Sequence, residues 1–175
     1  MSQCRGDWEA DRGWQAEGVS DGDPHDVPGV DRLQGHATLG LATQLARELT
    51  DVADVGIERL HSGLSVTITP ANPRARAFGW ADFSDSEEIF LQVGEYGGRW
   101  ELRPVPEDLT FLADVAWSVI AGRVREIFAR GRSLVTVTMP DGSAETEVGH
   151  EGLTGCLPLP FWRRWSRSVQ YAPYR

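Results

Sequence analysis

The residues with the most chemical potential form an acidic stretch, "WADFSDSEE", which runs from Trp80 to Glu88. Closely spaced carboxylate oxygens can ligate a divalent cation, but an EF-hand alignment fails because Glu87 stands where the loop requires its turn glycine. Ser84 and Glu87 also have the spacing of a helix capping box. We therefore predict a solvated loop without a metal ion. The residues of this stretch taken as candidate contacts to a partner protein are Trp80, Asp82, Asp85, Glu87 and Glu88.

The histidines and cysteines support little catalytic chemistry. No two histidines have the spacing of a helical zinc-binding pair; they are His25, His36, His61 and His150. His150 and Glu151 begin like a metalloprotease HExxH motif, but Thr154 occupies the second histidine position. Cys156 with a histidine as its base would make a nucleophilic pair, yet a structural cysteine is the simpler interpretation.

Several cofactor chemistries are excluded by composition. The 17 basic residues are all arginine, so no lysine is present to form a Schiff base or to complete a Walker A loop. Neither a GxSxG nucleophile elbow nor a GxGxxG dinucleotide loop occurs. We predict no cofactor. The enzymatic alternative is a small hydrolase that uses acidic residues of the 80–88 loop with His61 or His150 as its base.

The C-terminal segment "FWRRWSRSVQYAPYR", residues 161–175, combines aromatic rings with arginines and lacks acidic residues. It fits a platform for single-stranded nucleic acid, where rings stack on bases and arginines contact phosphates. It also fits a segment that packs on the domain through Trp162, Trp165, Val169 and Tyr171. Packing is favoured, because exposed rings in a cluster promote aggregation and the rest of the chain is acidic. The arginines taken as candidate partner contacts are Arg163, Arg164 and Arg167.

Overall composition predicts a cytoplasmic protein with no membrane segment. The net charge is −9 and hydrophobic residues make up 41% of the sequence, which is enough for a core. No apolar run reaches the roughly 18–20 residues of a bilayer span, and the N-terminus is too polar for a signal peptide. The acidic balance argues against nucleic acid as a partner and favours either a basic protein partner or a role in solubility alone.

The elements that must position these residues follow from hydrophobic periodicity. Residues 1–35 lack any period and predict an acidic, disordered tail, which leaves 36–175 as a single domain. Apolar residues at three- and four-residue steps predict a helix over about 37–54. Alternation then predicts strands at 64–69, 74–80 and 89–93, followed by a hairpin strand after a Gly97–Gly98 turn.

A second helix is predicted from Pro106 to about residue 129, with a wide apolar face that suits packing on a sheet. A second hairpin is predicted around Asp141–Gly142, with Val135 and Val137 on the same face as Val148. The expected class is α+β: an antiparallel sheet of about five to six strands with two main helices packed on it. The expected order is α-β-β-β-β-α-β-β, followed by the C-terminal aromatic and arginine segment.

These observations favour a non-catalytic protein-binding module. No catalytic constellation is visible, and the charge suits a basic protein partner, as in an inhibitor, an immunity-type protein, or a chaperone or adaptor. The hydrolase based on the 80–88 loop is the alternative, and a nucleic-acid binder acting through residues 161–175 is less favoured.

Overall fold

The computed structural model describes residues 36–83, 85–151 and 166–175. The chain divides into a unit of residues Met1–Arg32 and a unit of residues Leu33–Arg175, and every described residue belongs to the second. The tail predicted for residues 1–35 therefore lies outside the described residues. Neither helix of the described part combines the length and the apolarity that crossing a bilayer requires.

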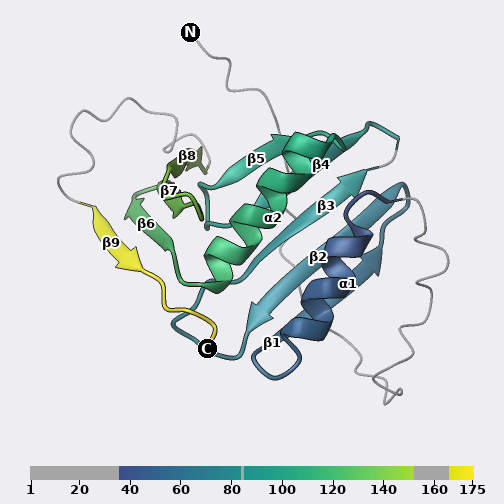
Figure 1. Cartoon of the computed structure of the whole chain (residues 1–175). Coiled ribbons are helices and arrows are strands. Elements are labelled where there is room, and N and C mark those ends of the chain that lie inside the picture. Colours follow the sequence, from purple (N-terminus) through teal and green to yellow (C-terminus); the bar gives the residue numbers. More distant parts are fainter. Residues whose placement is uncertain (1–35, 84, 152–165) are drawn as a thin grey trace, which may run out of the picture. The chain divides into compact units, whose positions relative to one another are not determined.

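The larger of two sheets is a five-stranded antiparallel meander in which neighbours in sequence are also neighbours in space. Its strands are β1 (Ala53–Arg59), β2 (Gly63–Pro70), β3 (Phe78–Phe83), β4 (Glu88–Gln92) and β5 (Arg99–Leu102). Helix α1 (Leu39–Glu48) precedes these strands and helix α2 (Pro106–Ile120) follows them. Both helices lie across one face of this sheet, here called the helix face, and leave the opposite, open face without a helix (Figure 1).

The smaller sheet has four antiparallel strands in the order β8-β7-β6-β9. They are β6 (Val124–Ala129), β7 (Arg132–Thr138), β8 (Ala144–His150) and β9 (Arg167–Gln170). The predicted α+β class with two helices and antiparallel pairing is confirmed. The described strands are divided between two sheets, because the chain following α2 forms a second sheet and does not extend the first.

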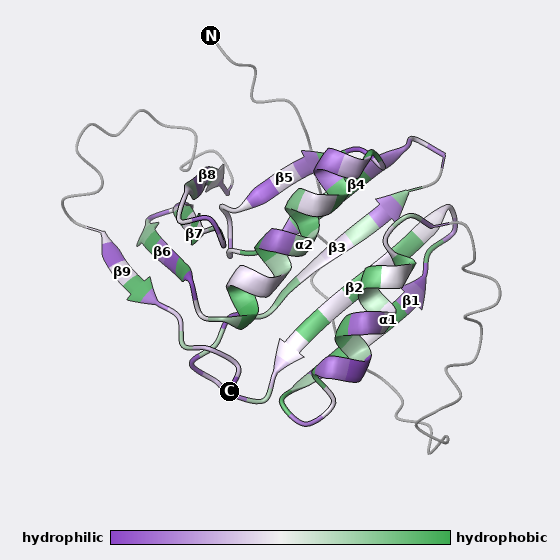
Figure 2. Ribbon diagram, viewed as in Figure 1, coloured by the Kyte–Doolittle hydropathy of each residue, from purple (hydrophilic) through white to green (hydrophobic). Residues whose placement is uncertain are grey.

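The core lies between the helices and the larger sheet. On β2, Leu64, Val66 and Ile68 are at most 1% exposed, whereas Thr67 and Thr69 on the open face are exposed. This is the period-2 alternation of a sheet with one covered face. The same alternation is visible as green and pale bands along β2 (Figure 2). The helices contribute Ala42, Leu45, Leu49, Leu112, Val115, Ala116 and Val119.

Helix α2 is shorter than predicted. It ends at Ile120, and Gly122 follows in the left-handed conformation with φ 72°, which favours glycine and stops a helix. The next residues form β6, in which Val124 and Glu126 are buried and Arg125 is exposed. The sequence pattern predicts helix here because Val124 also continues the helical row of apolar residues, so both periods fit this short stretch.

Helix α1 is also shorter than predicted, and the strand that follows it is missed by the sequence pattern. The amides of Val52 and Ala53 donate to the carbonyl of Leu49 at 2.8 and 2.9 Å, which closes the helix in a tight turn. Strand β1 then begins at Ala53. The pattern predicts helix to residue 54 because Ala53 extends the apolar stripe and Gly56 resembles a helix stop.

The hairpin of β4 and β5 has the predicted faces but a different turn. The amide of Gly94 donates to the carbonyl of Gly97 at 3.1 Å, so Glu95 and Tyr96 form the turn in place of Gly97 and Gly98. Gly98 still adopts the left-handed conformation, with φ 72°. As predicted, the outward residues are Arg99 and Glu101, and the inward residues are Trp100 and Leu102.

The hairpin of β7 and β8 is shifted by one residue from the predicted register. The amide of Met139 donates to the carbonyl of Ser143, so the loop holds Pro140, Asp141 and Gly142, one residue more than the predicted two-residue turn. Val135 therefore pairs with Glu147, and Val148 pairs with Leu134. A shift of one residue exchanges the two faces of a strand, which is why the predicted partners of Val135 were wrong.

The described part of the C-terminal segment is packed on the domain, as predicted. Strand β9 pairs with β6, and Tyr174 is only 4% exposed. The hydroxyl of Tyr174 donates to the carbonyl of Arg76 at 2.7 Å, and the amide of Ala172 donates to the carbonyl of Arg74 at 3.0 Å. The residues preceding β3, predicted as part of a strand, instead bind the C-terminal segment. Trp162 and Trp165 lie outside the described residues.

The β4–β5 turn joins the two sheets. The amide of Glu95 donates to Oε1 of Glu126 at 2.8 Å, and the amide of Gly97 donates to Oγ of Ser133 at 2.8 Å. Glu126 and Ser133 are both fully buried. Side chains of the smaller sheet therefore satisfy backbone donors of a turn that belongs to the larger sheet, which fixes one sheet against the other.

Candidate functional site

Trp80 and Asp82, two of the predicted partner contacts, lie on the helix face of β3 and are buried. Their exposed fractions are 3% and 5%. The Trp80 indole lies among core side chains, with its ring centroid 6.4 Å from that of Phe78. Alternation along β3 explains the arrangement, because residues two apart share a face. Neither side chain is accessible to a partner, so their position does not support the contact role expected from the sequence.

The carboxylate of Asp82 holds the start of helix α1. Its Oδ2 accepts hydrogen bonds from the Thr38 amide at 3.2 Å and the Thr38 hydroxyl at 2.9 Å. Thr38 is the N-cap residue of α1 and caps no amide with its own side chain. The first amides of a helix lack intrahelical acceptors, and a negative charge near them is favourable. Asp82 therefore acts as a cap supplied from β3.

His36 is the histidine that the structure places beside Asp82. Its Nδ1 lies 3.7 Å from Oδ1 of Asp82, in a region where both side chains are largely shielded from solvent. Sequence reasoning missed this pairing because the two residues are far apart in the chain and form no spaced motif. His61 and His150, the bases of the predicted hydrolase, are both exposed, His61 beside the β1–β2 turn and His150 at the end of β8. Among the described residues, neither His61 nor His150 is therefore paired with an acidic residue of the 80–88 loop, as the hydrolase hypothesis requires. Cys156 lies outside the described residues.

Removing the Asp82 carboxylate should destabilise the fold without affecting an exposed surface. We expect Asp82→Ala to lower the free energy of unfolding by about 1–2 kcal/mol, because the Thr38 amide loses its acceptor next to the core. Chemical denaturation followed by tryptophan fluorescence measures the change. Asp85→Ala, in the exposed loop, is the control and should stay within about 0.5 kcal/mol of the parent. Equal losses in the two variants would contradict the capping role.

The remaining predicted acidic residues are exposed: Asp85 and Glu87 lie in the connection between β3 and β4, and Glu88 is the first residue of β4. Glu87 has φ 54°, so its backbone adopts the left-handed conformation, which is uncommon for a residue other than glycine. Within residues 36–83, 85–151 and 166–175, no group of three or more metal-ligating side chains gathers as a cation site. The carboxylates of Asp85, Glu87 and Glu88 are therefore open to solvent.

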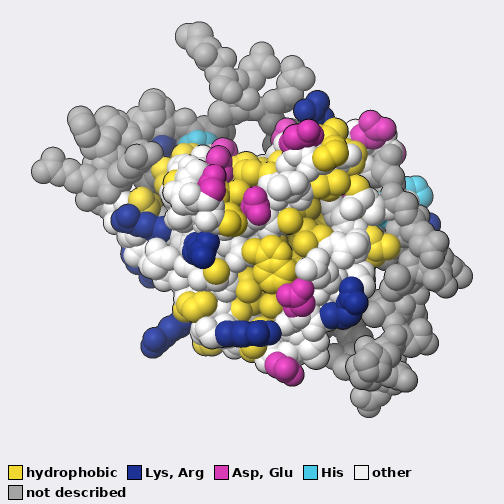
Figure 3. All heavy atoms as spheres, in the orientation of Figure 1, with side chains coloured by type: hydrophobic (Ala, Val, Ile, Leu, Met, Phe, Trp, Pro, Cys, Tyr) yellow, Lys and Arg dark blue, Asp and Glu magenta, His cyan; other side chains and the backbone are white. Residues whose placement is uncertain are grey.

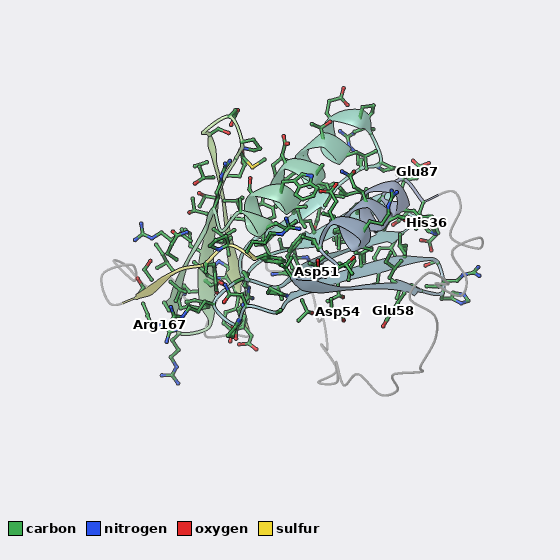
Figure 4. The ribbon with its side chains drawn as sticks, turned by 60° about the horizontal axis from the view of Figure 1, so that its bottom comes forward. His36, Asp51, Asp54, Glu58, Glu87 and Arg167 are labelled. Atoms are coloured by element: carbon green, nitrogen blue, oxygen red, sulfur yellow. The ribbon has the colours of Figure 1, made fainter. Side chains whose placement is uncertain are left out.

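Arg167 lies far from this loop. It is exposed on β9, with its guanidinium carbon 5.9 Å from the centroid of the Phe128 ring. Figure 4 shows Arg167 and Glu87 at opposite ends of the domain. Arg163 and Arg164 lie outside the described residues. Of the predicted contact residues that the structure describes, Arg167 therefore lies apart from the acidic loop.

A further group of carboxylates, which the sequence analysis did not single out, lies along β1. Asp54 and Glu58 are exposed on the open face of the larger sheet, and Asp51 precedes the strand (Figure 4). Their neighbours on β2 are uncharged, since Asp54 pairs with Thr69 and Glu58 with Ser65. The salt bridges among the described residues are His36–Asp82 and Arg103–Asp108, so no described residue forms an ion pair with the carboxylates along β1. We call Asp51, Asp54 and Glu58 the β1 acidic row.

A buried carboxylate lies at the junction of the two sheets. Glu126 is 0% exposed, and its Oε2 accepts a hydrogen bond from the Tyr171 hydroxyl at 2.8 Å. Burial, followed by this hydrogen bond, raises the pKa of Tyr171 well above its usual range. The phenol therefore keeps its proton and remains a donor to Glu126. The guanidinium carbon of Arg76 lies 5.6 Å from the Tyr171 ring centroid, so this cluster anchors the C-terminal segment.

The helix-bearing side of the domain shows apolar surface. Hydrophobic side chains are visible between α1 and α2 (Figure 3). Partly buried hydrophobic residues of the two helices include Leu41, Leu109 and Trp117. They pack on the core beneath them, and nothing in the described part of the chain identifies a ligand for this surface.

Comparison with known proteins assigns no relationship. No protein-family model matches the chain, and neither the curated proteins nor the solved structures include a significant match. The functional conclusion therefore depends on the geometry of the domain itself.

Proposed function

We propose that this protein is a non-catalytic protein-binding module that acts on a basic protein partner, in the manner of an inhibitor, an immunity-type protein, or a chaperone or adaptor. The observation that carries the proposal is the set of exposed carboxylates without ion-pair partners in the described residues. They lie in the β1 acidic row and in or beside the β3–β4 loop, as Asp51, Asp54, Glu58, Asp85, Glu87 and Glu88. Unneutralised charge of one sign attracts an oppositely charged partner and steers its approach.

Two buried carboxylates of this fold, Asp82 and Glu126, have structural roles. Asp82 is bonded to the start of α1, and Glu126 is bonded to the β4–β5 turn and to Tyr171. Catalytic carboxylates need access to a substrate, and these two are 5% and 0% exposed. The exposed carboxylates, by contrast, are solvated and suit recognition by charge.

Capture from a native extract, followed by reconstitution with the purified partner, tests the proposal. The full chain should recover a protein with a basic surface, and the affinity of the reconstituted complex should weaken as salt rises. A variant carrying Asp54→Asn, Glu58→Gln, Asp85→Asn and Glu87→Gln should bind at least about tenfold more weakly.

The matched control neutralises charge of the opposite sign. Arg74 and Arg123 are exposed, so Arg74→Gln with Arg123→Gln should leave the affinity within about twofold of the parent. Failure to recover any basic partner would refute the proposal. Binding that is equally strong in the acid-neutralised variant would refute it as well.

A further inference from the structure

Among the described strands, β1 pairs with β2 alone and is therefore an edge of the larger sheet. In an antiparallel pair, alternate residues exchange both backbone hydrogen bonds with the partner strand. The backbone amides and carbonyls of the residues between them point away from that strand. The amide of Leu60 donates to Gly63 and the amide of Ala71 donates to Val52, both at 2.9 Å. These two bonds fix the alternation, so the even-numbered residues of β1 bond to β2. The backbone groups of the odd-numbered residues point to the free edge.

The free edge is unpaired over most of its length. Ala53 uses its amide at the end of α1, where it donates to the Leu49 carbonyl. The outward amides of Val55, Ile57 and Arg59 have no backbone partner within the described residues. An exposed row of unpaired amides and carbonyls is a template for pairing with another strand.

The other edges of the two sheets are shorter or are approached by neighbouring elements. Strands β5 and β9 each span four residues, whereas β1 spans seven. Strand β8 also spans seven residues, but the β4–β5 turn lies against it, as Gly97 adjoins the Glu147 carbonyl and the Gly149 amide. Among the described strands, β1 therefore offers the longest edge without such an approach.

We propose that β1 pairs with an extended segment of the partner protein in which basic side chains occupy alternate positions. This inference rests on the proposed function, because it assigns the basic partner to one surface. The added strand would bond to the outward groups of Val55, Ile57 and Arg59. Its side chains on the open face would stand beside Asp54 and Glu58, at the cross-strand distance of about 5 Å.

The side chains of β1 define both faces of this partner segment. Asp54 and Glu58 are exposed on the open face, so that face of the segment carries arginine or lysine. Val55 and Ile57 lie on the helix face and are partly buried, so the alternate residues of the segment are apolar. Because Arg59 shares the helix face and is exposed, a basic residue opposite it is disfavoured.

A second copy of the same chain fits this edge less well. Two β1 strands paired edge to edge would place both sets of Asp54 and Glu58 on the same face of a continuous sheet. Like charges gathered on one face of paired strands are destabilising. Charge complementarity therefore selects the basic segment over self-association.

Two synthetic peptides of about eight residues test the inference with the full-length protein. In one peptide arginine alternates with valine; the other has the same composition with its arginines in one block. Titration calorimetry should show tighter binding of the alternating peptide. Asp54→Asn with Glu58→Gln should weaken that binding by about tenfold, whereas Glu101→Gln with Glu107→Gln, an equal charge change at exposed residues of β5 and of the start of α2, should change it less than about twofold.

The backbone contribution is tested separately. Arg59→Pro removes an outward amide that β2 does not use, so the fold should persist while binding of the alternating peptide falls by more than about tenfold. Amide hydrogen exchange on the unmodified protein provides a second measurement that needs no variant. Exchange at Val55, Ile57 and Arg59 should slow when the alternating peptide is added.

Several outcomes would overturn the inference: no binding, no preference for the alternating peptide, equal weakening by the two double variants, or unchanged exchange at β1. A dimer of the free protein that Arg59→Pro dissociates would also overturn it, because a second copy would then occupy the edge. If a basic partner is captured but cross-links away from β1, the proposed function stands and this inference fails. If no basic partner is captured, the proposed function fails.

Discussion

Substitution of Gly149 by alanine should strongly destabilise the domain. A Cβ atom at this position would overlap the carbonyl oxygen and carbon of Tyr96, and both are backbone atoms of the turn that joins the two sheets. Backbone cannot rotate away as a flexible side chain can, so β8 or the β4–β5 turn must shift. We expect the free energy of unfolding to fall by about 3 kcal/mol, at the upper end of the overpacking range.

Gly40→Ala is the matched control for this substitution. Gly40 lies in helix α1, and a Cβ atom there would meet nothing within 4 Å. Alanine has the higher helix propensity, so this variant should gain about 0.5–1 kcal/mol. Denaturant titration of the three proteins measures both changes. A Gly149→Ala variant as stable as the parent would show that the β4–β5 turn does not pack on β8 as described.

Substitution of Glu126 by alanine should also lower the free energy of unfolding strongly. In addition, it should loosen strand β9. The carboxylate is fully buried and accepts hydrogen bonds from the Glu95 amide and the Tyr171 hydroxyl, both at 2.8 Å. Burying a carboxylate is costly in itself, but removing it leaves two donors without an acceptor and opens a cavity. We expect a loss of about 3 kcal/mol in the free energy of unfolding.

Two further variants separate the loss of the hydrogen bonds from the loss of the buried side chain. Glu126→Gln preserves the volume and one acceptor oxygen, and the tyrosine hydroxyl can turn to accept from the new amide, so the expected loss is only about 1 kcal/mol. Tyr171→Phe removes one hydrogen bond to the carboxylate, with a loss of about 1.5–3 kcal/mol. In the Glu126→Ala background, Tyr171→Phe should cost less, because its partner is already gone. Additive losses would show that the two groups are not coupled.

Hydrogen exchange adds a readout of where the structure loosens. Amides of β9 should exchange faster in Glu126→Ala and in Tyr171→Phe, because Tyr171 follows that strand directly and ties it to β6. Amides in the middle of β2 should change only as far as global stability falls. Uniform acceleration over the whole domain would indicate global destabilisation without a specific role in anchoring the C-terminal segment.

The candidate site could be predicted only in part from the sequence. The acidic loop Asp85–Glu88 is exposed as expected, because consecutive polar residues between two strands have no core to enter. The alternation that identifies β3 also places Asp82 on the same face as Trp80, and that face is covered by the helices. The β1 acidic row was missed because the strand that displays it was assigned in part to a helix.

The sequence by itself determined the class of the fold and, for most residues, whether the side chain faces the core or the solvent. Apolar periods of two and of three to four residues give the two helices, most strands and the antiparallel arrangement, because these periods follow from local backbone geometry. The same periodicity correctly assigned the inward and outward residues of β2 and β5.

Only the tertiary structure decided the strand register, the division into two sheets and the hydrogen-bond partners of the buried polar groups. One extra loop residue exchanged the faces of β8, and Gly122 ended a helix whose apolar row continued beyond it. Asp82 bonds to Thr38, 44 residues away in the chain, and Glu126 and Tyr171 bond to each other across 45 residues. The physical reason is that a buried hydrogen bond depends on which segments meet in space, and a local pattern of residues carries no information about that meeting.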